Sequence, residues 1–364
     1  MMEDSGQAPA QEEDGFPVAI ASLLASSRNA KLSQVRMWDL SLMYLNGQQN
    51  IRYDRSLQQY VSLRTTPGRN QLVVNLILNM YRSVSRLQTN YPGVTVMPSS
   101  PSNEDIAKAK ASEEALKYFY HSQNVKRDLG KAMQWMVSCG NVGLHQYFDN
   151  DEDKIKLKVI SPYDMFFEAG CSDENESAFV AIRSIVRKKD LIAAFPDKKS
   201  IIEDQIDLGT DQSEDNTYPH SQSYQGESFF FPRIELYEIY FKEGTHALVV
   251  GNHYLYKAKT PIKLTPVQLI KYTNLPDRLW GKGMIESIID IQNLYNKARN
   301  QIINNVALMS NPKWLIPKTA GVNGSAIKGT PGEKIYYNAA GGAPQQISAA
   351  GLPSYVMENI AKLQ

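Results

Sequence analysis

The sequence has few of the residues that cross-link small secreted domains or bind metals. Its 364 residues include only two cysteines, Cys139 and Cys171, and five histidines. Two cysteines cannot build a multi-disulfide scaffold, and their scarcity suits a reducing compartment. No histidine stands at zinc-ligand spacing from either cysteine. Cys139 lies near the apolar Met136, which predicts a buried structural thiol rather than a nucleophile.

An excess of charge of one sign is also absent. Thirty-nine Lys and Arg residues balance 38 Asp and Glu residues, so the net charge is +1. Domains that hold nucleic acid by bulk electrostatics are usually strongly basic, and this balance argues against that class. The basic runs "VRKK" and "RSVSR" are short, and such runs usually form solvated faces.

The sequence shows no pattern typical of a signal peptide or of a membrane-spanning helix. The first fourteen residues contain five acids and no Lys or Arg, whereas a signal peptide opens basic and then becomes apolar. We expect residues 1–27 to form a disordered acidic tail. The densest apolar run, "LVVNLILNMY" at 72–81, is about half the roughly 20 residues that a membrane helix needs.

The sequence lacks the common catalytic motifs. The stretch "GTPGEK" lacks the spacing of a phosphate-binding loop, and Lys334 is followed by Ile335 rather than by Ser or Thr. No Gly-x-Ser-x-Gly elbow occurs, and no pair of carboxylates stands out. We therefore expect no enzyme activity and no cofactor.

Hydrophobic periodicity predicts an α+β fold. Helical patterns cover about 29–49, 70–87, a segment capped by Ser102 or Asn103, and a segment ending near Cys139. The stretch "KIKLKVISPYDMFF" at 154–167 has a strand-like alternation, "AFVAIRSIVR" at 178–187 predicts a second strand, and the stretch 233–259 predicts antiparallel strands with turns at Glu243-Gly244 and Gly251-Asn252. Between them, residues 203–228 carry seven acids and no Lys or Arg, which predicts a flexible acidic loop.

A long helix is predicted over 282–309, and it has an unusual composition. Its apolar residues recur mostly at alternating steps of four and three, as in a coiled-coil seam rather than a wide globular face. The predicted seam comprises Met284, Ile288, Ile291, Tyr295, Ala298, Ile302, Val306 and Met309. The other faces are rich in Asn and Gln, although Asn is a poor helix former. Such amides could bond to the same helix in a neighbouring subunit, line a wet passage, or simply be solvated.

Several segments together resemble the portal proteins of tailed bacteriophages, the head-to-tail connector family. They are "YLNGQQN", "NQLVVNLILNMYRSVSRL" followed by "YPGVTVMPSS", "ISPYDMFFEAG", "LPDRLWGKGMIESIIDIQNLYNKARNQ" and "NPKWLIPK". Their order, and a long helix followed by a small insertion, carry the resemblance more than any single motif.

The resemblance implies a mixed helix and sheet wing at 28–281, a first stem helix at 282–309 and a small α/β clip at 310–352. A second stem helix would begin at 353–364, where the chain stops, and we expect a longer polypeptide. The clip would dock a motor protein through Lys313, Trp314, Lys318, Lys328 and Lys334, with a core role for Trp314 equally open. Lys297, Asn300 and Asn304 are candidates for a channel lining or for polar contacts between subunits.

The function implied is that of a ring, usually dodecameric, at one capsid vertex of the virion, assembled in the host cytoplasm. Double-stranded DNA would pass through it non-specifically during genome packaging and ejection. The implied partners are the terminase large subunit, head-completion and tail adaptor proteins, and the major capsid or scaffold protein. Two alternatives stay open: another virion ring or scaffold protein without DNA passage, and a nucleic-acid-binding module.

Overall fold

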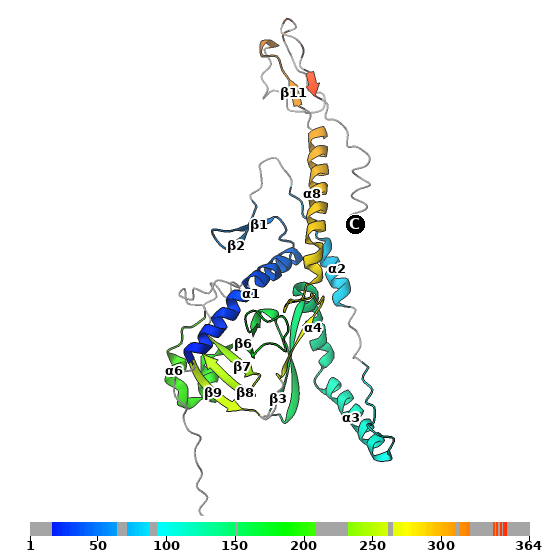
Figure 1. The fold of residues 1–364 in the computed structure, drawn as a ribbon. Helices are drawn as coiled ribbons and strands as arrows, with labels where there is room; N and C mark the ends of the chain where they lie inside the picture. The colour runs from blue at the N-terminus through cyan, green and yellow to red at the C-terminus, as the bar shows by residue number, and fades with distance from the viewer. Residues whose placement is uncertain are drawn as a thin grey trace, which may run out of the picture. The chain divides into compact units, whose positions relative to one another are not determined.

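The chain folds into two compact units of mixed helices and antiparallel sheets, which confirms the α+β class (Figure 1). The computed structural model describes residues 17–63, 71–86, 93–149, 152–208, 232–260, 265–310 and 313–320, with 338, 340, 343 and 345–347. The first unit comprises Met1–Leu42 and Met80–Ser287, and the second comprises Met43–Asn79 and Ile288–Gln364. Residues 43–79, predicted as part of a continuous wing, thus group with the long helix.

Helix α1 (Pro17–Leu45) begins well before its predicted start. Ile20 and Leu24 are 2% and 6% exposed and join the core of the first unit. The prediction of a disordered tail is therefore wrong for residues 17–27, while residues 1–16 lie outside the described part. Two polar residues, Ser27 and Lys31, also occupy the buried face. They break the apolar periodicity, so the first turns of the helix could not be predicted from it.

The main core of the first unit lies between α1 and a five-stranded antiparallel sheet, and Figure 1 shows the helix running alongside the sheet. The strands, in sheet order, are β5 (Met165–Phe167), β6 (Phe179–Arg187), β7 (Arg233–Phe241), β8 (Thr245–Val250) and β9 (His253–Lys259). Both predicted hairpin turns are confirmed, with Gly244 and Gly251 at φ +87° and +56°. The short helices α5 (Lys188–Ala194) and α6 (Lys199–Glu203) pack on a separate apolar cluster.

A second sheet in this unit has the order β10-β3-β4, with β3 at Asn141–Asp149, β4 at Lys154–Ile160 and β10 at Val267–Lys271. The helices α3 (Asn103–Ser122) and α4 (Val125–Cys139) precede it. The predicted cap is confirmed, because the Ser102 hydroxyl accepts the Asp105 amide at 3.2 Å. Cys139 is 1% exposed, and burial raises the pKa of its thiol to about 12, as expected of a structural cysteine.

Two buried ionisable groups tie α1 to the segment that leads into β5. The Lys31 ammonium donates to the main-chain oxygens of Tyr163 and Met165 at 2.9 and 2.6 Å. It lies 4.3 Å from the centre of the Phe166 ring, and burial lowers its pKa well below the usual value. Asp39 accepts the Tyr163 hydroxyl at 2.8 Å, and burial raises the pKa of this carboxyl to about 7.

The second unit is built on the long helix α8 (Met284–Ser310), which confirms the helix predicted at 282–309. It also contains the hairpin of β1 (Ile51–Asp54) and β2 (Gln59–Ser62) and the start of α2 (Leu76–Ser85). The helix predicted at 70–87 is too long, because residues 71–75 are not helical. Beyond α8, β11 (Lys313–Leu315) pairs antiparallel with β12 (Gln345–Ile347), and a short 3-10 helix spans Lys318–Ala320.

Several predicted segments lie outside the described residues. They are most of the acidic loop at 203–228 and the second stem helix expected from Pro353. β12 was not predicted.

Candidate functional site

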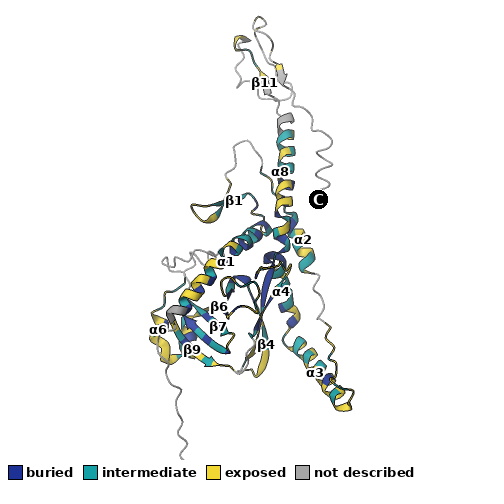
Figure 2. Ribbon diagram, in the orientation of Figure 1, coloured by how far each residue is buried: buried dark blue, intermediate teal, exposed yellow. Residues whose placement is uncertain are grey.

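The long helix α8 carries buried, intermediate and exposed residues (Figure 2), and its exposed and buried faces differ in chemistry. Residues on a helix are spaced by about 100°, so Ile291, Leu294, Ala298, Ile302 and Val306 fall within one arc of about 120°. Ile285, Ile289, Gln292 and Asn296 fall on another face and are buried. The buried face is therefore half apolar and half amide.

The amides of this face bind a non-helical segment at residues 71–75, which we call the strap. Asn300 accepts the Leu72 amide at 2.7 Å and donates to the Leu72 carbonyl at 3.0 Å. Asn296 accepts the Val74 amide at 3.0 Å, and Gln292 donates to the Val74 carbonyl at 2.7 Å. Gln292 also accepts the Leu76 amide at 3.2 Å. These three side chains form an amide ladder that takes the place of a neighbouring β-strand.

The ladder works because two repeats match in length. Four residues of an α-helix rise about 6.0 Å, and two residues of an extended strand rise about 6.6 Å. Amides spaced by four on α8 therefore meet every second residue of the strap. Each primary amide offers both a donor and an acceptor, as a main-chain unit does. A run of Asn and Gln at this spacing can thus pair with a strand without depending on its side chains.

A second set of amides closes the network around the ladder. Asn296 donates to the Gln49 side-chain oxygen at 2.6 Å, and the Gln49 amide donates to Asn75 at 3.1 Å. Asn75 in turn donates to the Leu45 carbonyl at 2.9 Å. The Tyr44 hydroxyl donates to Asn293 at 2.7 Å. Buried polar groups that satisfy one another in this way fix a single arrangement of the chain.

The predicted seam lies largely open in the single chain. Ile291 and Val306 are 51% and 50% exposed, and Leu294, which the seam prediction omitted, is 53% exposed. Met284, Ile288, Ala298 and Ile302 are half-buried, and the side chain of Met309 lies outside the described part. Tyr295 alone of the described seam residues is buried, at 1%, and its hydroxyl accepts a hydrogen bond from Arg299.

The candidate polar residues are placed differently from one another. Lys297 is exposed, whereas both polar atoms of the Asn300 amide are used within the chain. Asn304 is half-buried and continues the four-residue spacing of the ladder. Sequence reasoning identified the excess of amides but missed the roles of Gln292 and Asn296. Their spacing with Asn300 was a visible signal, but the partner at 71–75 was predicted to be helical and could not be matched to it.

The docking candidates lie beyond α8. Lys313 and Trp314 belong to β11, with side chains outside the described part, and Lys318 is exposed at the start of a 3-10 helix. Lys328 and Lys334 lie outside the described residues.

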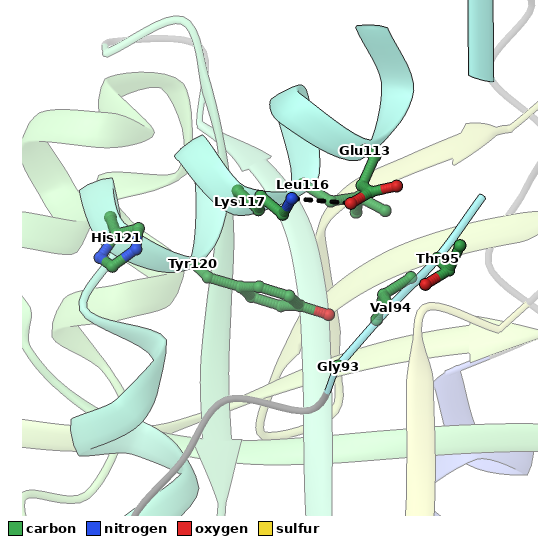
Figure 3. Close-up of a pocket in the computed structure, with 8 residues that line it drawn as sticks. All are labelled: Gly93, Val94, Thr95, Glu113, Leu116, Lys117, Tyr120 and His121. Atoms are coloured by element: carbon green, nitrogen blue, oxygen red, sulfur yellow. Dashed lines mark hydrogen bonds and ion pairs between the residues drawn. The ribbon is translucent and has the colours of Figure 1, made fainter. Parts of the chain in front are cut away.

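A hollow of about 350 Å³ in the first unit, between α3 and residues 93–95, shows no catalytic arrangement (Figure 3). Its polar wall is an ion pair along α3, with Lys117 2.7 Å from Glu113, and Tyr120 extends from the same helix toward Val94. Across the described ranges, no group of three or more His, Cys, Asp or Glu side chains could hold a metal ion. Among the helices described, none combines the length and hydropathy needed to cross a membrane.

Comparison with known proteins gives one informative result. The chain matches no curated protein. The family model described as phage SU10 portal protein matches residues 104–364, which include both sheets of the first unit, α8 and the segment that follows it. This match covers well over half of the 364 residues. The chain therefore belongs to the phage SU10 portal protein family, whose members are components of the virion.

Proposed function

We propose that this protein is the repeating subunit of a portal ring at one capsid vertex, through which double-stranded DNA is packaged and ejected. The observation that carries the proposal is the open apolar stripe of α8, on the helix that the family match includes. Ile291, Leu294 and Val306 are each about half exposed on one face of a 27-residue helix. Such an exposed apolar stripe on one face of a helix is typical of a protein–protein interface.

Identical copies of the chain can bury such a stripe by assembling into a ring. A head-to-tail contact between unlike surfaces closes into a ring when the rotation between copies permits it. In the proposed ring, the exposed stripe packs on α8 of a neighbour and on the second stem helix, with Met284, Ile288, Ala298, Ile302 and Met309 completing the seam. We propose a dodecamer, the usual number in portal proteins.

The charge balance supports passage of DNA rather than retention of it. Each phosphate neutralised by Lys or Arg strengthens binding in a salt-dependent way, and the net charge of the chain is only +1. Each ladder amide already gives one donor and one acceptor to hydrogen bonds within the chain, which favours exposed residues over Asn300 as channel contacts. We therefore assign any channel contact on α8 to exposed residues such as Lys297, and we retain Asn304 as a candidate.

The clip, proposed at 310–352, would dock the terminase large subunit and later the head-completion and tail adaptor proteins. The β11–β12 pair supports a small structured domain there. Lys313, Trp314, Lys318, Lys328 and Lys334 are the proposed contacts. Deleting residues 311–348 should leave the units folded and rings assembled, but it should abolish DNA packaging; undiminished packaging would refute this docking role.

Electron microscopy of the purified protein tests the proposed function. We expect closed rings with an open axial channel, and capsids that carry one ring at a single vertex. Closed discs would favour the alternative of a virion ring or scaffold without DNA passage. Monomers that bind duplex DNA with a steep salt dependence would instead favour a nucleic-acid-binding module.

A further inference from the structure

The amide ladder uses only one edge of the strap. In an extended segment, the N–H and C=O groups of successive residues point to opposite sides. The ladder binds the main chain of Leu72 and Val74, so the groups of Gln71 and Val73 point away from α8. Within the described residues, the main-chain groups of Gln71 and Val73 have no hydrogen-bond partner.

The residues of this free edge do nothing to block pairing. The strap reads "QLVVN" and contains no charge and no proline, which are the usual devices that protect an exposed strand edge. It carries two adjacent β-branched residues, Val73 and Val74, which favour strand pairing. Leu72 adds a side chain that is 45% exposed. An uncharged edge held rigidly by three amides is a template for another extended segment.

We infer that the free edge of the strap pairs with an extended segment of a neighbouring copy of this chain. The inference rests on the proposed ring and specifies a second contact within it. The strap is fixed to the face of α8 that lies about 140° around the helix from the centre of the open stripe, through Gln292, Asn296 and Asn300. Because each copy in a ring has a neighbour on either side, the stripe and the strap face different neighbours. The ladder then has two roles: it satisfies the inner edge of the strap and presents the outer edge in a fixed register.

Hydrogen exchange of single amides tests this pairing directly. The Val73 amide should exchange rapidly in the dissociated chain and at least tenfold more slowly in assembled rings, because it gains a main-chain acceptor. The Val74 amide, already bound by Asn296, is the internal reference and should be protected in both states. Rings in which the Val73 amide still exchanges rapidly would overturn this inference and leave the proposed ring intact. Failure to form rings at all would overturn both.

A proline substitution gives an independent test. Val73→Pro removes the outward N–H and favours an extended conformation at Leu72, in which the N–H and C=O of Leu72 can both reach Asn300. We expect dissociated Val73→Pro to keep the helical content and urea midpoint of the parent chain, while the concentration needed for assembly rises at least tenfold. The matched control Val73→Thr keeps the N–H and the branched side chain and should assemble normally. Normal assembly of Val73→Pro would count against the pairing.

Discussion

At the scale of single residues, hydrogen bonds explain why α8 is a stable helix although it is rich in Asn. Asn lowers helix stability because its side chain competes for main-chain hydrogen bonds. In this helix the side chains of Asn296 and Asn300 are occupied by the strap and by Gln49. A propensity cost of roughly 0.5 kcal/mol per Asn is offset by hydrogen bonds worth about 1 kcal/mol each.

Asn296→Ala should destabilise the second unit by about 1–3 kcal/mol, because it leaves the Val74 amide and the Gln49 oxygen without this partner in a buried site. Urea unfolding followed by circular dichroism measures the change. The neighbouring substitution Lys297→Ala removes an exposed side chain and should change stability by less than about 0.5 kcal/mol. Equal effects from the two substitutions would contradict the ladder.

Asp39 predicts a pH dependence in the first unit. Burial raises the pKa of its carboxyl to about 7 in the folded chain, against 3.8 for an aspartate side chain exposed to water. Between these values the unfolded state binds fewer protons than the folded state, so stability should fall as pH rises from about 4 to 8, by on the order of 2–4 kcal/mol. In Asp39→Asn, whose amide oxygen can still accept the Tyr163 hydroxyl, this fall should be much smaller. Thermal unfolding of both proteins at pH 4 and pH 8 measures this difference. An equal fall in stability in the two proteins would refute the raised pKa of Asp39.

At the scale of elements, the two faces of α8 have different roles: the buried face stabilises the fold, and we propose that the exposed face mediates assembly. Ile289 is 7% exposed and Ile291 is 51% exposed, only two residues apart. Ile291→Asp should leave the single chain folded, with a change below about 1 kcal/mol, but should prevent ring assembly by placing a charge on the seam. Ile289→Asp should unfold the second unit by burying an unpaired charge. Sedimentation velocity and circular dichroism distinguish the outcomes, and normal rings from Ile291→Asp would refute the seam.

Some of the helices and strands could be predicted from the sequence, and others could not. Sequence patterns located α3, α4, α8 and the β7–β9 meander. Ser102 caps α3, Gly140 ends α4, and turns at Gly244 and Gly251 separate the three strands. The patterns failed where a polar residue occupies a core position, as Lys31 does on α1, and where an apolar segment is not helical, as at 71–75. The strap looks helical in isolation, and only its partners on α8, more than 200 residues away, determine its conformation.

At the scale of the whole molecule, the family match and the open stripe of α8 support a single account: a chain whose exposed surfaces are completed by identical neighbours. Tertiary contacts fold each unit, with the ladder holding the strap to α8. In the proposed ring, contacts between subunits cover the seam and, by our inference, the outer edge of the strap. In that proposed ring, a near-neutral charge would let the channel pass DNA without binding it tightly.

Native mass spectrometry of the purified protein, combined with electron microscopy of the same sample, tests the ring most directly. The account predicts one dominant species at a fixed multiple of the chain mass, twelve for a dodecamer, that images as a closed ring with an axial channel. The same preparation of Ile291→Asp should give folded monomers. A wild-type protein that remains monomeric at all concentrations, or that forms open chains of variable length, would contradict the account.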